Sequence, residues 1–136
     1  MPSRYLTAIY QDGGRELPSV DCWGLTTIAR SELYGLPGLS KFGEVTRLGI
    51  HAFQRSYRAE VGRALERCDP FPGAIAAAMK GDICAHVALV VLKDDRLQVL
   101  EINPGSGARI IRLQEFKDNY MTVVFYRDRD LCNLSS

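Results

Sequence analysis

Five short apolar runs in the second half of the chain constrain its fold more than any other feature. They are rich in Val, Ile, Leu and Ala, and they are separated by turn-forming residues such as Asp94-Asp95 and Pro104-Gly105-Ser106-Gly107. Short apolar runs between such turns are typical of β-strands that follow one another in a meander. The sequence therefore predicts five strands, at residues 74–79, 86–92, 97–102, 110–113 and 121–126.

The first half of the chain has helical patterns instead. Asp21 is a good N-cap, apolar residues recur at helical spacing after it, and Gly35 suits the left-handed position that ends a helix. A second apolar stripe with charged residues on its other side predicts a helix over residues 51–68. The first twenty residues contain Gly13-Gly14 and Pro18, and they predict an irregular loop.

Length and charge limit the class of protein. A chain of 136 residues can bury its own core, so we expect one domain over residues 1–136. Helices followed by an antiparallel meander indicate an α+β fold, with N-terminal helices packed on a five-stranded sheet. The formal net charge of +1 argues against a nucleic-acid partner, and no apolar run is long enough to span a membrane. The N-terminus lacks the apolar stretch of a signal peptide.

Cys22 and His86 are the candidate reactive residues. Cys22 follows the N-cap of the first predicted helix, and His86 opens an apolar strand that packs against this helix in the predicted layout. A helix N-terminus and a nearby imidazolium both lower the pKa of a thiol, and the thiolate is the attacking species. The pair predicts a cysteine nucleophile with a histidine partner.

The other cysteines carry no such signal. Four scattered cysteines in a chain of this size do not predict a disulfide framework, and Cys68 and Cys132 are interpreted as small core or surface thiols. Cys84 and His86 lack the second close pair that structural zinc sites use, so no metal is expected.

Several motifs occur in an order that resembles the NlpC-type cell-wall cysteine peptidases, a papain-like family. Its signature has Tyr, then Gly-Gly, then Asp-Cys-(Ser/Trp)-Gly-Leu, and later His-Val-Gly-(Ile/Leu), Leu-His-Ala and Gly-Val-Arg. The matching residues are Tyr10, Gly13-Gly14, Asp21-Cys22-Trp23-Gly24-Leu25, His86-Val87-Ala88-Leu89, Leu100-Glu101-Ile102 and Gly107-Ala108-Arg109. Trp23, and Leu36-Pro37 after the first helix, resemble the branch found in tail proteins of phages and prophages.

The resemblance implies a papain-like NlpC fold and hydrolysis of a peptide bond in peptidoglycan stems. Cys22 would attack the carbonyl and form a thioester, and His86 would pair with the thiolate and protonate the leaving amine. The backbone N–H of Cys22 and the hydroxyl of Tyr10 would face the developing oxyanion. No metal or organic cofactor is implied.

The third member of the triad is where the sequence departs from the family. The resemblance places Glu101 where the family has His, Asn or Gln, and a carboxylate can orient an imidazole as Asp does in serine proteases. Strand alternation puts Asn103 on the same face as Glu101, and a tight turn at residues 94–95 would place Asn103 opposite His86. We favour Glu101, and Asn103 remains the alternative.

Two further departures concern the substrate groove. Ala88 stands where the family has Gly, and its methyl group would narrow the groove. The segment 40–70 lies between the first helix and the first strand, and it is either a lid or a docking surface.

Three functions remain open. The first is a phage or prophage tail-tip endopeptidase that opens the wall for genome entry, acting on stem peptides and assembling with tail-tip or baseplate proteins. Such a protein would be synthesised in the host cytoplasm, carried in the virion tail and active at the cell wall. The second is a structural tail-tip or plug protein with lost or residual activity. The third is a thiol amidase or acyltransferase on another substrate. The intact pair of Cys22 and His86 favours the enzyme.

Overall fold

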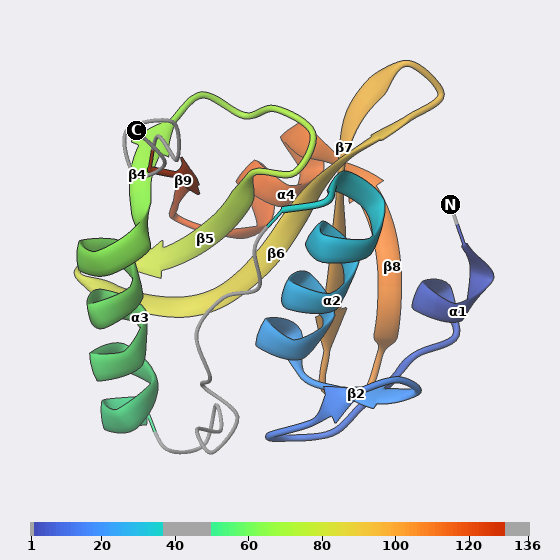
Figure 1. Ribbon diagram of the computed structural model, residues 1–136, viewed down its shortest axis with the longest axis horizontal. Coiled ribbons are helices and arrows are strands. Elements are labelled where there is room, and N and C mark those ends of the chain that lie inside the picture. The colour runs from blue at the N-terminus through green and yellow to red at the C-terminus, as the bar shows by residue number, and fades with distance from the viewer. Residues whose placement is uncertain (1, 37–49, 130–136) are drawn as a thin grey trace.

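The computed structural model of the protein describes residues 2–36 and 50–129. A curved, antiparallel sheet of six strands dominates this part of the chain, in the order β4-β9-β5-β6-β7-β8 (Figure 1). The strands are β4 (Leu65–Cys68), β5 (Ile75–Lys80), β6 (Ile83–Lys93), β7 (Arg96–Asn103), β8 (Gly107–Arg112) and β9 (Thr122–Asp128). The four strands β5 to β8 lie side by side in chain order, with β8 at the edge of the sheet, and β9 returns to pair with β5.

A second, much smaller sheet lies near the N-terminus. It has the order β1-β3-β2 and consists of β1 (Ile9–Tyr10), β2 (Arg15–Glu16) and β3 (Ser19–Val20). Four helices complete the described chain: α1 (Ser3–Leu6), α2 (Cys22–Tyr34), α3 (Ile50–Ala64) and α4 (Leu113–Asn119). None of the described helices is long and apolar enough to cross a lipid bilayer.

The predicted fold class is wrong. We expected a papain-like α+β fold with N-terminal helices packed on a five-stranded sheet, whereas the described chain is mostly β, with a six-stranded sheet, a three-stranded sheet and few short helices. Residues 65–68 were counted as the end of a helix because the apolar stripe continues through them. They instead pair with β9, from Leu65 opposite Asp128 to Cys68 opposite Phe125. A long-range pairing of this kind leaves no local signal.

Three very short strands and two short helices, α1 and α4, were not predicted either. We expected an irregular loop over the first twenty residues, because α1 has four residues and β1, β2 and β3 have two each, which is too short for a periodic pattern. Helix α4 is also short, and its first residue, Leu113, was counted as the end of a strand.

The signals at helix ends and turns were more reliable. Asp21 caps α2 by accepting a hydrogen bond from the Gly24 N–H, and Gly35 ends the helix in the left-handed region at φ 63°. Asp94 and Asp95 both have positive φ, 54° and 60°, as a two-residue hairpin between β6 and β7 requires. These predictions are confirmed.

The six-stranded sheet buries side chains on both faces. Helix α2 covers one of them, which we call the α2 face, and helix α4 lies behind the other, the α4 face (Figure 1). Successive residues of a strand point to opposite faces. The α2 face buries Val87, Leu89, Val91, Leu100 and Ile102 against α2. The α4 face buries Ala88, Val90, Val99 and Ile111 against Phe116.

Residues 40–49 of the segment expected to be a lid or docking surface lie outside the described residues, as do Pro37 and Cys132.

Candidate functional site

The start of α2 is built around a buried carboxylate. Asp21 is 3% exposed, and its two oxygens accept hydrogen bonds from the N–H groups of Gly24 (2.8 Å) and Gly13 (3.1 Å). Arg15 also pairs with Asp21 at 2.6 Å. A carboxylate that accepts from backbone N–H groups at a helix start stabilises that end of the helix. Cys22, the first residue of α2, is therefore held at a well-defined position.

Two glycines explain how the preceding loop approaches the helix so closely. A Cβ atom added to Gly24 would lie 2.3 Å from the Gly14 carbonyl oxygen, and one added to Gly14 would lie 2.4 Å from the Ser19 carbonyl oxygen. Neither position has room for a side chain. The backbones of Gly14 and Gly24 therefore lie against each other at the start of the helix.

Cys22 and Tyr10 both lie in this region. The Cys22 side chain is a free thiol, 2% exposed, and packs in the apolar cluster of the α2 face. Tyr10 is opposite Val20 in the β1–β3 pairing, and its hydroxyl donates a hydrogen bond to Asp12 at 2.7 Å. The proposed oxyanion donor is therefore engaged with a carboxylate in this structure.

His86 forms a buried pair with Glu101. The Nε2 atom of His86 lies 3.0 Å from Oε1 of Glu101, and neither side chain is exposed to solvent. Because a carboxylate can only accept, Nε2 carries the proton, and in the neutral ring Nδ1 is the basic nitrogen. The imidazole is flanked by the rings of Phe116 and Tyr120, with centroid distances of 6.2 and 5.7 Å. These contacts set the plane of the ring.

Glu101 has two further partners on the α4 face. Arg109 donates from Nε to Oε2 at 2.7 Å, and the Tyr120 hydroxyl donates to Oε1 at 3.3 Å. Burial by itself would raise the pKa of Glu101, but the hydrogen bonds from His86 and Arg109 outweigh it and hold the pKa at about 2. Glu101 is therefore a carboxylate at neutral pH.

The contact between His86 and Glu101 runs diagonally across two strands. Leu89 is opposite Leu100 in the β6–β7 pairing, so continuing this register would bring Asn103 opposite His86. The hydrogen bond nevertheless goes to Glu101, which lies two residues nearer the turn. Diagonal neighbours on one face of a sheet are within reach of long side chains. Of the two acceptors considered for His86, the structure places Glu101 against the ring.

The thiol and the imidazole lie in separate clusters. Cys22 packs with the apolar side chains of the α2 face, whereas His86 contacts Phe116 and Tyr120 on the α4 face. The sheet that carries His86 thus stands between its imidazole and the cluster of Cys22. The structure brings His86 and Glu101 into contact, whereas the Cys22 side chain packs in the apolar cluster of the α2 face.

The start of β6 has an irregularity next to His86. Ala78 of β5 pairs with His86 and Met79 pairs with Cys84, so Ala85 is an extra residue in a β-bulge. Gln54 of α3 makes two hydrogen bonds to the backbone next to the bulge. Its amide donates to the Cys84 carbonyl at 2.6 Å and accepts from the Cys84 N–H at 2.8 Å. Bulges redirect side chains, and this one lies immediately before the histidine.

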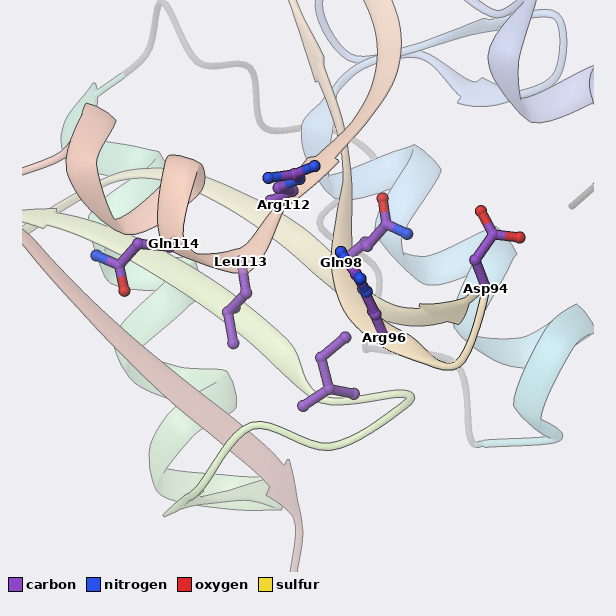
Figure 2. A pocket seen from close by; sticks show the side chains of 7 residues that line it. Asp94, Arg96, Gln98, Arg112, Leu113 and Gln114 are labelled. Atoms are coloured by element: carbon purple, nitrogen blue, oxygen red, sulfur yellow. The ribbon is translucent and has the colours of Figure 1, made fainter.

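A depression of about 510 Å³ lies where β7 begins and β8 ends (Figure 2). Its labelled lining residues are Asp94, Arg96, Gln98, Arg112, Leu113 and Gln114. A second depression, of about 430 Å³, involves Cys68 and Arg127. Neither of these two depressions is lined by Cys22, His86 or Glu101.

The described residues include no group of three or more His, Cys, Asp or Glu side chains that could hold a metal ion. Comparison with known proteins found no matching family model, no similar curated protein and no similar solved structure.

Sequence patterns missed the polar groups that surround the histidine. Arg109 is part of the Gly107-Ala108-Arg109 motif, but no sequence pattern links Tyr120 or Gln54 to the histidine. The one signal for Arg109 was its place after Gly107, because the hairpin between β7 and β8 puts it opposite Glu101. Gln54 gave no signal, since its contact with Cys84 joins two distant parts of the chain.

Proposed function

We propose that the protein is a cysteine endopeptidase of the NlpC type that cleaves stem peptides of peptidoglycan. The observation that carries the proposal is the buried contact of 3.0 Å between His86 and Glu101. Burying an ionisable pair is expensive, and a pair with a strongly shifted pKa is more common at functional sites than elsewhere. Cys22, held at the start of α2 by the Asp21 cap, supplies the nucleophile.

The proposed reaction has two covalent steps. The Cys22 sulfur attacks the carbonyl carbon of the scissile amide, and its proton passes to Nδ1 of His86. The resulting imidazolium protonates the leaving amine as the carbon–nitrogen bond breaks, which leaves a thioester. His86 then accepts a proton from the water that attacks the thioester; the carbon–sulfur bond breaks, the carboxylic acid product leaves, and the imidazolium returns its proton to the Cys22 sulfur. Glu101 remains ionised and stabilises the imidazolium.

The mechanism requires the Cys22 thiol and Nδ1 of His86 to meet. In the structure they belong to clusters on different faces of the sheet, so the proposed active form differs from it around the start of β6. The β-bulge at Ala85 is the point where β6 departs from regular pairing, which makes it the most suitable place for such a change.

We further propose that the protein acts as part of a phage or prophage tail. The support is the resemblance of Trp23 and of Leu36-Pro37 to the tail-associated branch of the family. Synthesis in the host cytoplasm and delivery in the virion tail would bring the enzyme to the cell wall, with tail-tip or baseplate proteins as its partners. Assembly is then the natural trigger for bringing the thiol and the imidazole together.

A second function is favoured by a specific observation. Cys22 is 2% exposed, His86 is 0% exposed, and they lie in different clusters. A structural tail-tip protein that retains both residues without their chemistry would have this arrangement.

The test compares the wild type with Cys22→Ala on purified Gram-negative sacculi, and mass spectrometry identifies the released muropeptides. Cleavage within stem peptides should fall at least about a thousandfold in Cys22→Ala, because the nucleophile is lost. Cys68→Ala, which also removes a free thiol, is the matched control and should keep full activity. Circular dichroism verifies that each variant is folded.

Equal release by the wild type and Cys22→Ala would exclude the mechanism. No release by the wild type, alone or in assembled tails, would favour the structural function.

A further inference from the structure

We propose that Arg109 is a positioning residue that sets both the orientation and the charge of the His86–Glu101 pair. The inference rests on the proposed function, in which His86 carries the proton. The supporting observation is that Oε2 of Glu101 accepts from Arg109, whereas Oε1 accepts from His86 and Tyr120.

Arg109 reaches Glu101 directly across the β7–β8 pairing. The two residues are opposite one another in the register, and side chains so placed are close enough to touch. The Nε atom of Arg109 donates to Oε2 at 2.7 Å, a short distance that is typical of a charge-assisted hydrogen bond.

This hydrogen bond fixes the rotation of the carboxylate. The last torsion of a glutamate side chain has broad, weakly preferred positions, so an unanchored carboxylate would rotate. Arg109 holds Oε2, which leaves Oε1 to accept from Nε2 of His86 at 3.0 Å and from the Tyr120 hydroxyl at 3.3 Å. With Nε2 committed to Glu101, Nδ1 of His86 is kept as the nitrogen that exchanges protons.

Arg109 also balances the charge that His86 experiences. Within residues 2–36 and 50–129, the charged and titratable side chains seen to contact Glu101 besides His86 are Arg109 from β8 and Tyr120, which follows α4. A carboxylate paired only with His86 would strongly favour the imidazolium. The guanidinium neutralises part of that attraction, which weakens the preference of the pair for the imidazolium and favours proton release.

The contact differs from an ordinary surface ion pair. The Arg109 side chain is 44% exposed, but its acceptor, Glu101, is fully buried. In the comparable pair of Arg127 and Glu66, the distance is 3.2 Å and both side chains are exposed, at 56% and 38%. Exposed pairs of this kind contribute little. Arg127 is therefore a matched control for Arg109.

The experiment measures the titration of His86 by NMR and hydrolysis in parallel. The chain has two histidines, so a His51→Gln background leaves His86 as the single ring to follow. Arg109→Gln should raise the midpoint of the His86 titration by about one pH unit, because a positive charge near the ring is lost. It should lower kcat on soluble stem-peptide fragments about tenfold, with KM nearly unchanged.

Arg109→Lys keeps the charge and should restore most of the titration midpoint, whereas Arg127→Gln should change neither measurement. A midpoint in Arg109→Gln within about 0.2 units of the wild type would overturn the inference, since loss of this charge must shift it. If the wild type releases no muropeptides but the midpoint moves as expected, the proposed function fails while the control of His86 by Arg109 stands. If the wild type is active and neither the midpoint nor kcat changes, Arg109 is a surface residue and the proposed function is unaffected.

Discussion

The two faces of the six-stranded sheet bury very different side chains. The α2 face is apolar along the central strands, with Leu89 and Leu100 against the helix that begins at Cys22. The α4 face has an apolar cluster too, but it also holds a hydrogen-bonded group of charged and polar residues centred on Glu101. Leu100 and Glu101 are adjacent in the chain and belong to these two environments.

The difference shows what each face contributes to the proposed chemistry. An apolar face stabilises the fold and positions the nucleophile through the packing of α2, without tuning any proton affinity. On the α4 face, an ionised carboxylate is buried beside an imidazole where apolar side chains could pack. Burying such a charge costs free energy unless its hydrogen-bond partners are present. The candidate proton-transfer groups thus lie on one side of the sheet, and substitutions on the other side can test packing separately from them.

The largest effect is expected from breaking the α4 face at its centre. Glu101→Ala leaves His86 buried without its acceptor and removes the partner of Arg109, so the free energy of unfolding should fall by about 4 kcal/mol. Urea unfolding at pH 7 measures the loss. Asn103→Ala, two residues further along β7, is the control and should cost less than about 1 kcal/mol. Glu101→Ala should also reduce hydrolysis more than Asn103→Ala, and the reverse order would transfer the role to Asn103.

The neighbouring residue tests the other face. Leu100→Ala removes a fully buried side chain from beneath α2 and should cost about 3 kcal/mol through lost burial and the cavity that remains. Because Leu100 points away from the carboxylate, the titration of His86 should not change. The same urea and NMR measurements apply, and a shifted His86 midpoint in Leu100→Ala would show that the two faces are coupled.

How much of the fold could be predicted depended on the range of the interactions. The Asp21 cap, the left-handed Gly35 and the Asp94-Asp95 turn are set by residues within a few positions of one another, and sequence alone located them. The fold class was wrong because β4 exists only through its pairing with β9, about sixty residues away. Helix-like periodicity in residues 65–68 was overridden by that pairing.

The candidate site was predictable to a similar extent. The residue types of Cys22 and His86 made them candidates, whereas Glu101 was a candidate through the family resemblance. A tight turn at residues 94–95 favoured Asn103 opposite His86, and the spacing to Gly107 favoured Glu101. The bulge at Ala85, which alters the register next to His86, has no signature in the sequence. The assignment of Cys22 and His86 to different faces depends on how the sheet curves and on which helix covers which side, and no local pattern encodes either.

The acid dependence of stability sharpens the contrast between the faces. The pKa of Glu101 is lowered from 4.5 to about 2, so the folded state binds this proton less readily than the unfolded state. A depressed pKa contributes stability that is fully present above about pH 4.5 and is lost as the pH falls through about 2. The shift corresponds to roughly 3 kcal/mol.

Urea unfolding between pH 2 and 5.5 should therefore show a decline in the free energy of unfolding of the wild type that is largely absent in Glu101→Gln, whose amide cannot ionise. Leu100→Ala should show the same decline as the wild type, at a lower free energy of unfolding at every pH, because Leu100 has no ionisable group and points away from Glu101. An equal decline in the wild type and Glu101→Gln would mean that other carboxylates, and not the α4 face, control the response to acid.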